Sequence, residues 1–481
     1  MAFSSLVFLL FFLPIFLLVY YVTPKVFRNW VIVLGGYIFY AWGAPRFAFF
    51  LLLMIAIDYV LSRVIAWKNG QEKKYQARVL LIFSLLANIG LLGYFKYSNF
   101  FVGQVNAFLP LLHLSPMPWR EVILPIGVSF TVLQELSYII EVYRGTIKPA
   151  RSVIDFAAYL LLFPHVIAGP IVRYIDIAGQ LLARTYTRVG FFEGIRRFCL
   201  GLAKKVLIAN TMSGIADAVF YLHTVRELSS PLAWLGIVAY AMQIYFDFSG
   251  YSDMAIGLAR MLGFHFLENF NQPYLATSIT DLWRRWHISL STWMREYLYI
   301  PLGGNRVAKW RMYLNLWIVF LVSGLWHGAN WNFIIWGGFH GLFLVLDKMF
   351  WLKTSARLPA FVNRALTFVM ILVGWVFFRI ENIHDAGLFI VRLFNLSTWF
   401  TPIAVRWTEV LDYRGIFTLI LALGICFVPA TRFAQKFATW LRAWQEGWKV
   451  FATSAYSLGL LVLSLCALVN AQFNPFIYFR F

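Results

Sequence analysis

Charged residues are scarce in this chain of 481 residues: 13% are Asp, Glu, Lys or Arg, whereas 61% are hydrophobic. Soluble domains are about a quarter charged and about half apolar, and their polar groups could not cover so much apolar surface. A water-soluble globular fold is therefore excluded. The apolar residues gather in long blocks, among them residues 6–21, 79–93, 234–246 and 458–469.

These apolar blocks do not alternate between apolar and polar residues, which excludes the strands of a transmembrane barrel. Helices are the other structure that satisfies its own backbone in lipid. The sequence therefore predicts an all-α, polytopic bundle of transmembrane helices, with re-entrant segments such as 155–168. At about 20 residues per span, the blocks allow about 12 crossings. Because no repeat or linker interrupts them, we expect a single integral domain over residues 1–481.

Cysteine is also rare, and Cys199, Cys426 and Cys466 lie far apart in apolar sequence. They form neither a disulfide framework nor a metal motif, and no two histidines have the spacing of a helical zinc site, so we predict no metal. The chain lacks a phosphate loop, a dinucleotide fingerprint and a G-x-S-x-G elbow. It also lacks a basic stretch and a cleavage site around its first apolar block. We therefore expect residues 1–21 to be retained as the first span.

The net charge of +20 could indicate a nucleic-acid partner, but the Lys and Arg residues lie in short loops between apolar blocks. Such loops face the cytoplasm under the positive-inside rule, which places residues 306–311 and 432–449 inside. The resulting topology puts both termini on the periplasmic side of a bacterial inner membrane, with a periplasmic tail at 472–481. The expected partner is membrane lipid, and no nucleic acid.

Polar residues inside spans are costly, so they are candidates for function. Gln243 and Asp247 lie four residues apart on one helix face, and Asp253 follows them. The side chains of Gln243 and Asp247 could satisfy each other in a structural network that ties helices together. The alternative is that these residues take part in catalysis or line a tunnel.

A second polar cluster lies in an amphipathic block at 278–311, which begins with a candidate helix cap at Ser278. Trp283 and Trp286 recur at helical spacing, and this composition suits a helix lying at the membrane interface. His287 either packs among these tryptophans or takes part in chemistry, and spacing alone favours packing.

A third cluster contains Trp326, His327 and Asn330. As a helix, the preceding run 313–326 would be ~21 Å long at 1.5 Å per residue, short of a ~30 Å core. We therefore expect His327 within the membrane, approached from the outer side. A buried neutral histidine suits a general base, and a core histidine satisfied by a carbonyl is the equal alternative.

These clusters together resemble the membrane-bound O-acyltransferase family, in particular its bacterial polysaccharide branch. The motifs that carry the resemblance extend over most of the chain: LPIGVSF at 124–130, FPHVIAGP at 163–170, YFDFSGYSDMAIG at 245–257, FNQPY at 270–274, WRRWHISLS at 283–291 and LWHGAN at 325–330. One departure is Thr131-Val-Leu, where relatives often have an aromatic-rich stretch.

The resemblance implies a helical bundle around a funnel or tunnel, with His327 as the near-invariant histidine and His287 as the second catalytic position. It implies acetyl transfer from a cytoplasmic thioester, expected to be acetyl-CoA, to a periplasmic exopolysaccharide, expected to be alginate. Delivery would use a periplasmic acetyltransferase partner, so the polymer itself need not bind here. Related systems also suggest Tyr478 as acyl carrier, although the aromatic tail equally suits an interfacial anchor.

Further alternatives concern the role of two arginines, the polymer that is acylated and the class of protein. Arg284 and Arg285 have a geometry that suits the phosphates of the donor, and holding lipid headgroups is the simpler role. Another polymer could be acylated, such as peptidoglycan, cellulose or a teichoic acid that receives D-alanine. A non-enzymatic transporter with buried proton relays is the third class, and the inverted repeats typical of one are not found.

Overall fold

The computed structural model describes residues 1–224, 228–399, 410–431, 436, 439–440, 445–470 and 476. Within these ranges every regular element is a helix, and eight helices are long and apolar enough to cross a membrane. The predicted all-α, polytopic membrane fold is therefore confirmed. The eight are Pro45–Gly70, Lys74–Leu112, Arg188–Leu222, Ser230–Met261, Trp331–Ser355, Ala360–Arg379, Tyr413–Ala430 and Gly447–Asn470.

Eight such helices in the described part of the chain are fewer than the about 12 crossings expected from span length. Some apolar blocks form helices that are too short, such as Phe8–Val22. The block at 155–168 gives only α7 (Val153–Leu160) and α8 (Phe163–Val166), and residues 156–172 are all buried. Irregular backbone at membrane depth is tolerated only where protein surrounds it, which fits the re-entrant character expected of this block.

Packing divides the chain into two compact units, Met1–Ile195 with Ala255–Leu267, and Arg196–Met254 with Glu268–Phe481. Neither unit is a continuous segment, because the chain passes from one to the other after residues 195, 254 and 267. The two are called unit 1 and unit 2 below.

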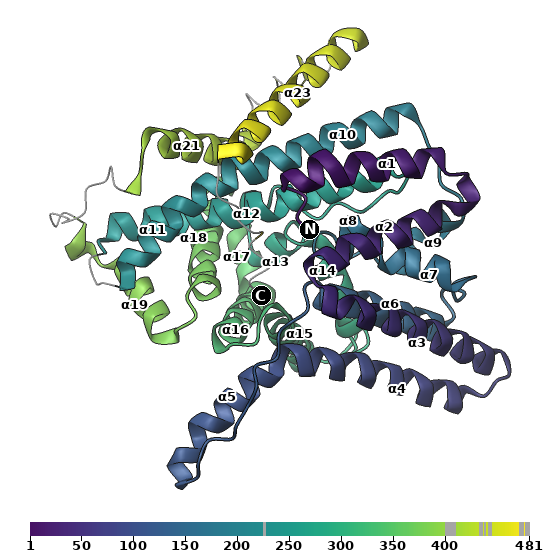
Figure 1. Cartoon of the computed structure of the whole chain (residues 1–481). Coiled ribbons are helices and arrows are strands. Elements are labelled where there is room, and N and C mark those ends of the chain that lie inside the picture. The colour runs from purple at the N-terminus through teal and green to yellow at the C-terminus, as the bar shows by residue number, and fades with distance from the viewer. Residues whose placement is uncertain are drawn as a thin grey trace. The chain divides into compact units, whose positions relative to one another are not determined.

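Unit 1 contains the N-terminal helices and the start of α10. Its elements are η1 (Phe8–Phe12), α1 (Leu13–Val22), η2 (Lys25–Phe27), α2 (Arg28–Gly43), α3 (Pro45–Gly70), α4 (Lys74–Leu92), η3 (Gly93–Tyr97), α5 (Ser98–Phe108), η4 (Leu109–Leu112), α6 (Val128–Arg144), α7, α8, α9 (Tyr174–Leu182) and the first part of α10 (Arg188–Ala203). Figure 1 shows α3 and α4 side by side, with α5 projecting beyond the end of α4.

Polar side chains join the helices of unit 1 inside its core. Asp58 of α3 accepts hydrogen bonds from Ser84 and Asn88 of α4, both at 2.9 Å. Ser62 of α3 bonds the hydroxyl of Tyr138 on α6 at 3.0 Å. Carboxylates are almost never buried unless they are hydrogen-bonded or paired, and these bonds satisfy Asp58.

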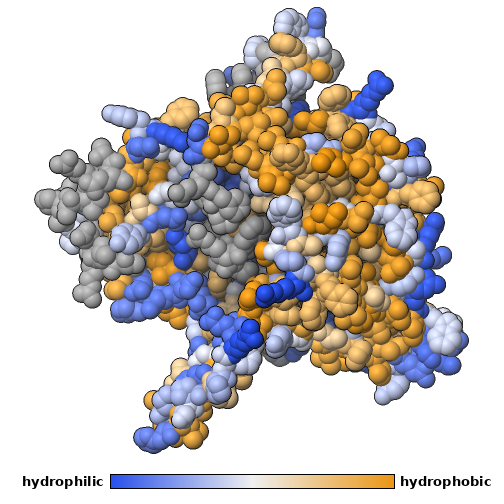
Figure 2. All heavy atoms as spheres, viewed as in Figure 1, coloured by the Kyte–Doolittle hydropathy of each residue, from blue (hydrophilic) through white to orange (hydrophobic). Residues whose placement is uncertain are grey.

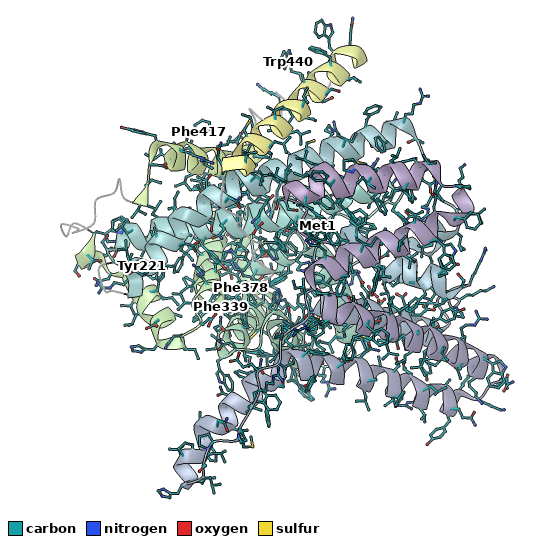
Figure 3. All side chains as sticks on the ribbon, viewed as in Figure 1. Met1, Tyr221, Phe339, Phe378, Phe417 and Trp440 are labelled. Atoms are coloured by element: carbon teal, nitrogen blue, oxygen red, sulfur yellow. The ribbon has the colours of Figure 1, made fainter. Side chains whose placement is uncertain are left out.

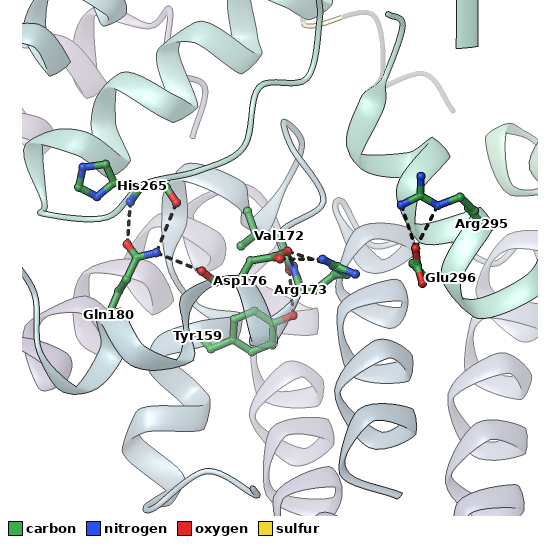
Figure 4. Close-up of polar contacts among 8 residues, drawn as sticks. All are labelled: Tyr159, Val172, Arg173, Asp176, Gln180, His265, Arg295 and Glu296. Atoms are coloured by element: carbon green, nitrogen blue, oxygen red, sulfur yellow. Dashed lines mark hydrogen bonds and ion pairs between the residues drawn. The ribbon is translucent and has the colours of Figure 1, made fainter. Parts of the chain in front are cut away.

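The segment 255–267 is attached to α9 by polar contacts (Figure 4). Arg173 caps this helix through an ion pair with Asp176 at 2.8 Å. Further along α9, the Gln180 side chain accepts a hydrogen bond from the backbone amide of His265 at 2.7 Å. Residues from the later part of the sequence thereby belong to unit 1.

Unit 2 contains the remaining described helices. Its elements are the last part of α10, η5 (Lys204–Ala209), α11 (Asn210–Thr224), most of α12 (Ser230–Met261), η6 (Pro273–Leu275), α13 (Ile279–Trp283), α14 (Ile288–Met294), η7 (Arg295–Tyr299), α15 (Lys309–His327), α16 (Trp331–Leu346), η8 (Asp347–Trp351), α17 (Leu352–Ser355), α18 (Ala360–Arg379), α19 (Ile383–Phe394), η9 (Leu396–Thr398), α21 (Tyr413–Phe427), η10 (Val428–Ala430) and α23 (Glu446–Asn470).

Helices α15 and α16 approach each other closely at a pair of glycines. A Cβ atom on Gly324 would lie 2.3 Å from the Phe333 carbonyl oxygen, and one on Gly337 would lie 2.3 Å from the Phe320 carbonyl oxygen. Only glycine allows backbones to come this close. The contact fixes the end of α15, which carries His327, against α16.

Large apolar side chains remain exposed on the helices, as the composition predicts. Figure 2 shows apolar areas over much of the visible face, and Phe83 and Leu86 of α4 are 59% and 65% exposed. Such a surface would aggregate in water, whereas lipid covers it without cost.

Candidate active site

His287 lies at the break between α13 and α14. Ser278 caps α13 by accepting a hydrogen bond from the Asp281 amide at 3.0 Å, as the sequence predicts. The helix then ends at Trp283, and His287 adopts φ 45°, in the left-handed region that residues with side chains rarely occupy. Strained backbone of this kind gathers at functional sites, where surrounding structure maintains it.

The tryptophans of this block are buried in protein, which corrects the prediction of a helix lying at the membrane interface. Trp283 is 9% exposed and Trp286 is 2% exposed. Trp286 packs on Trp375 of α18, with ring centroids 5.0 Å apart. The amphipathic spacing arose because these side chains face the core of unit 2 from two short helices.

The His287 ring is completely buried and is held through one nitrogen. Its Nδ1 lies 3.2 Å from Oδ1 of Asn269, which also accepts hydrogen bonds from the backbone amide and the hydroxyl of Ser289 at 3.2 Å and 2.9 Å. The other nitrogen, Nε2, is buried without a hydrogen-bond partner. Burial lowers the pKa of the His287 imidazole well below its ordinary value, and nearby His327 lowers it further. The ring is therefore neutral.

His327 ends α15, as predicted, and is 3% exposed. Its Nδ1 lies 2.7 Å from the carbonyl oxygen of Ser323. Because a carbonyl only accepts, Nδ1 carries the proton and the lone pair is on Nε2. A core histidine bonded to a carbonyl and a general base are therefore compatible interpretations of His327. The carbonyl that accepts the Nδ1–H also fixes the tautomer that a general base requires.

Aromatic rings connect three buried histidines of unit 2. The ring of Trp326 lies 5.0 Å from His327 and 6.2 Å from His287, measured between centroids. Trp336 lies 4.8 Å from His327 and 4.9 Å from His340. These rings exclude water, so polar groups among them interact more strongly than they would in solvent.

Two more rings close this aromatic cluster. Phe378 of α18, labelled in Figure 3, lies 5.7 Å from His327. Trp283 of α13 donates its indole N–H to Nδ1 of His340 at 3.4 Å. Trp283 thus contacts the histidine cluster and, as described next, also lines a cavity.

A cavity of about 410 Å³ lies among α13, α14, α15 and α16. Its lining is mainly apolar, with Leu290 and Phe320 among the side chains. Three cationic side chains, Arg284, Arg295 and Lys348, also line it, and Ser323 brings the wall to one helical turn from His327. Arg295 forms an ion pair with Glu296 at 2.8 Å (Figure 4). An apolar slot with a few cations suits a long ligand that has a phosphate at one end.

The acidic motif on α12 forms ion pairs instead of the internal contact proposed from sequence. Gln243 donates to Ser213 of α11 at 3.1 Å, and Asp247 pairs with Lys205 of η5 at 3.0 Å. Asp253 pairs with Lys204 at 2.6 Å and also with Arg197. The contact between Gln243 and Asp247 was wrong because each side chain is turned to a different partner helix, whereas the idea of a network tying helices together is correct.

Two other candidates have structural partners. Asn330 caps α16 by accepting a hydrogen bond from the Trp331 amide at 2.7 Å. Arg285 pairs with Asp281 at 2.9 Å and does not line the cavity, in contrast to Arg284. These contacts give both residues a role in shaping the site.

In the C-terminal tail, Tyr478 lies outside the described residues, and Phe476 is described. Phe476 is 4% exposed and stacks on Tyr251 of α12 at 4.6 Å between centroids. It also lies 5.9 Å from Phe248, whose ring meets the His287 ring edge-on at 4.7 Å. Phe476 is therefore packed inside unit 2, one ring from His287.

Three functional candidates in the structure were missed in the sequence. His340 and Lys205 each lie in an apolar run, and intramembrane ionisable residues are a recognisable signal. Asn269 had no such signal, because it lies in an irregular segment before FNQPY and meets His287 only through tertiary folding.

Comparison with known proteins gives one family and several full-length relatives. The sequence model for MBOAT, the membrane-bound O-acyltransferase family, matches residues 36–383, which include both catalytic candidates. A probable alginate O-acetylase of Pseudomonas putida is 42% identical over 100% of both chains. Another, from Pseudomonas aeruginosa, is 44% identical over 83% of this chain and 76% of its own. A peptidoglycan O-acetyltransferase of Helicobacter pylori is 36% identical over 80% of this chain and 78% of its own.

Proposed function

The chain belongs to the membrane-bound O-acyltransferase family and is an O-acyltransferase, and we propose that it transfers an acetyl group from a cytoplasmic thioester to the O-acetylation of a periplasmic polysaccharide. The observation that carries this proposal is the pair of buried histidines, His287 and His327, next to an apolar cavity lined by cations. Such a site can activate a hydroxyl and hold a thioester with water excluded. The similarity to probable alginate O-acetylases supports alginate as the polymer.

The donor is acetyl-CoA, bound in the cavity with its phosphates toward Arg284, Arg295 and Lys348. Arginine pairs with phosphate through a rigid fork of donors, and lysine supplies a point charge. The neighbouring basic loop at 306–311 faces the cytoplasm under the positive-inside rule, where acetyl-CoA is made. The apolar lining receives the pantetheine arm and directs the acetyl group toward Ser323 and His327.

The chemistry follows from the tautomer of His327. Its Nε2 lone pair removes the proton of an attacking hydroxyl as the oxygen bonds to the thioester carbonyl carbon. The carbon–sulfur bond then breaks, and the departing thiolate takes the proton from His327. Atoms and charge balance without a metal or a covalent histidine intermediate.

The attacking hydroxyl is that of Tyr478, and a periplasmic acetyltransferase then moves the acetyl group to the polymer. Support comes from the burial of Phe476, two residues earlier, next to the ring that contacts His287. Phe476 itself lies inside unit 2 near the candidate histidines, and Tyr478 follows it by two residues in the sequence. The enzyme lies in the bacterial inner membrane with both termini periplasmic.

Deletion of the gene tests the function directly. We expect the acetate content of secreted alginate to fall, with the acetate of cell-wall peptidoglycan unchanged. Restoring the gene with His327→Ala should leave transfer ~10²–10⁴-fold below wild type, because a positioned base contributes that much. The measurement is acetate released by mild alkali from each purified polymer.

The matched control is His384→Ala, since His384 is an exposed histidine of α19. It should restore acetylation fully. Near-normal acetylation with His327→Ala, at equal membrane expression, would contradict the assigned base. A loss confined to peptidoglycan would replace alginate by that polymer as the product.

A further inference from the structure

Asn269 makes the contacts that decide how His287 can act. Its Oδ1 accepts the backbone N–H of Ser289 at 3.2 Å, and a backbone amide can only donate. The carboxamide is therefore not free to exchange its oxygen and nitrogen. Its Nδ2 donates to the hydroxyl of Ser252 at 3.1 Å, a contact that is compatible with this orientation.

This orientation sets the tautomer of His287. Nδ1 of His287 faces two oxygens, Oδ1 of Asn269 at 3.2 Å and the Ser289 hydroxyl at 3.4 Å. Because the Ser289 hydroxyl gives its hydrogen to Oδ1 at 2.9 Å and Oδ1 is an acceptor, Nδ1 carries the proton. The Nε2 atom of the neutral ring then has a lone pair and no hydrogen. His287 can accept a hydrogen bond at Nε2 but cannot donate one there.

The Nε2 atom of His287 is also buried without a partner. An unsatisfied buried acceptor is costly, and a catalytic role, a bound water or an ion accounts for such atoms in proteins. The left-handed backbone at φ 45°, the edge-on ring of Phe248 and the tilted ring of Trp326 keep the His287 ring in place. A lone pair held in this way can accept a hydrogen bond only from an O–H or N–H group.

We infer that Asn269 is a positioning residue that holds His287 as a hydrogen-bond acceptor for a substrate O–H or N–H group, which excludes His287 as donor to the thioester carbonyl. This inference rests on the proposed acetyl transfer. The two sources of the donated hydrogen are the attacking hydroxyl and the amides of the pantetheine arm. Loss of the hydrogen bond to the attacking hydroxyl lowers kcat, whereas loss of the hydrogen bond to the pantetheine amides raises KM for acetyl-CoA.

The kinetic experiment uses the full chain in nanodiscs with acetyl-CoA and follows release of the free thiol in a single turnover, because Tyr478 accepts one acetyl group per chain. Here kcat is the limiting rate constant of that turnover and KM is the acetyl-CoA concentration that gives half of it. Asn269→Leu keeps the size and removes the acceptor, and we expect kcat/KM to fall on the order of 100-fold, as for a misplaced reacting group. Asn269→Asp keeps an acceptor facing Nδ1 and should recover at least a tenth of wild-type kcat/KM. A fall in kcat alone identifies the hydroxyl, and a rise in KM for acetyl-CoA identifies the pantetheine amides.

The control is Asn363→Leu, because Asn363 is a buried asparagine of α18 that donates to the Ser355 carbonyl at 2.7 Å. It should lower the melting temperature without changing kcat/KM of the folded protein. If Asn269→Leu behaves like this control, the inference is overturned. Absence of thiol release by wild type would instead refute the proposed donor, so the two failures are distinct.

A spectroscopic measurement keeps the inference testable without turnover. Histidine labelled with 15N in its ring reports which nitrogen is protonated, and the signal lost in His287→Gln identifies His287. We expect a proton on Nδ1 in wild type and a mixture of tautomers in Asn269→Leu. A wild-type His287 with its proton on Nε2 would overturn the inference.

Discussion

Buried ionisable side chains of unit 2 are of two kinds: those whose charge is neutralised in an ion pair, and histidines that are hydrogen-bonded through one ring nitrogen. Lys205 and Asp247 are 4% and 2% exposed and neutralise each other at 3.0 Å. His287 and His327 are also buried, and their Nδ1 atoms face neutral acceptors, the Asn269 amide oxygen and the Ser323 carbonyl oxygen. Charged groups survive burial when they are paired, whereas a base must keep its lone pair for the substrate. The pairs therefore maintain the fold, whereas the two histidines have the burial and the hydrogen bonding that the proposed chemistry requires.

Removing one partner of the buried ion pair should destabilise the protein strongly. Asp247→Ala leaves the Lys205 ammonium without its carboxylate, at a cost of about 3–5 kcal/mol. The double change Lys205→Met with Asp247→Leu removes both charges and should recover most of the stability. Thermal unfolding in detergent, followed by size-exclusion chromatography, measures both.

The control for this prediction is Glu193→Gln, which breaks the ion pair with Arg260, where both side chains are about two-fifths exposed. Exposed pairs contribute about 0–1 kcal/mol, so little change is expected. If Asp247→Ala were as stable as wild type but lost acetyl transfer, Asp247 would belong to the catalytic machinery.

At the scale of the helices, small deviations from regular structure place the site residues. The π-helical turn η5 carries Lys204 and Lys205, which pair with Asp253 and Asp247 of α12. Such insertions into a helix are frequent at functional sites. The second feature is the close approach of two helices at glycines. It packs α15, which ends at His327, against α16.

Adding a methyl group at the α15–α16 contact should displace His327. In Gly337→Ala the new Cβ would lie 2.3 Å from the Phe320 carbonyl oxygen, which is backbone and cannot rotate away. We expect a lower melting temperature by several degrees and a fall in acetyl transfer, since overpacking typically costs about 1–3 kcal/mol. Gly338→Ala is the adjacent control, because its Cβ would meet the side chains of Trp317 at 3.5 Å and Leu321 at 3.9 Å, which are ordinary van der Waals contacts. Equal behaviour of the two variants would refute the close-contact argument.

At the scale of the whole molecule, the proposed acetyl transfer relies on two features of unit 2, the cavity and the packed Phe476. The cavity in unit 2 has cations that suit a cytoplasmic phosphate ligand. The tail leads from α23 (Glu446–Asn470) to Phe476, which is packed against Tyr251 in the same unit. Transfer across the membrane requires only that the acyl group pass between these features, so the polymer need not enter the bundle.

The prediction for the C-terminal tail concerns the hydroxyl of Tyr478 and the side of the membrane on which this residue lies. Tyr478→Phe keeps the ring and removes the hydroxyl, so polymer acetylation should be lost with membrane insertion unchanged. A cysteine at position 478, introduced with Cys466→Ser because Cys466 is the exposed cysteine among the described residues, should react with an impermeant reagent from the periplasmic side. Normal acetylation by Tyr478→Phe would exclude the carrier role, and labelling only from the cytoplasm would exclude the topology.

Sequence alone determined the features that depend on composition and local pattern. Low charge and long apolar blocks require membrane helices, because lipid gives backbone groups no other partner. The cap at Ser278 and the helical run ending in His327 are local as well, and the structure has both. Family motifs at 36–383 identified the enzyme class because they occur together in one chain.

Only the tertiary structure decided which polar groups meet. The spacing of Gln243 and Asp247 allowed a mutual bond, but neighbouring helices offered Ser213 and Lys205 instead. Likewise, Asn269 and His287 are 18 residues apart and touch because the segment between them folds back. Periodicity describes one helix at a time, whereas side-chain pairing in a bundle depends on which helices pack together. That is why the catalytic candidates could be found in the sequence and the residue that orients one of them could not.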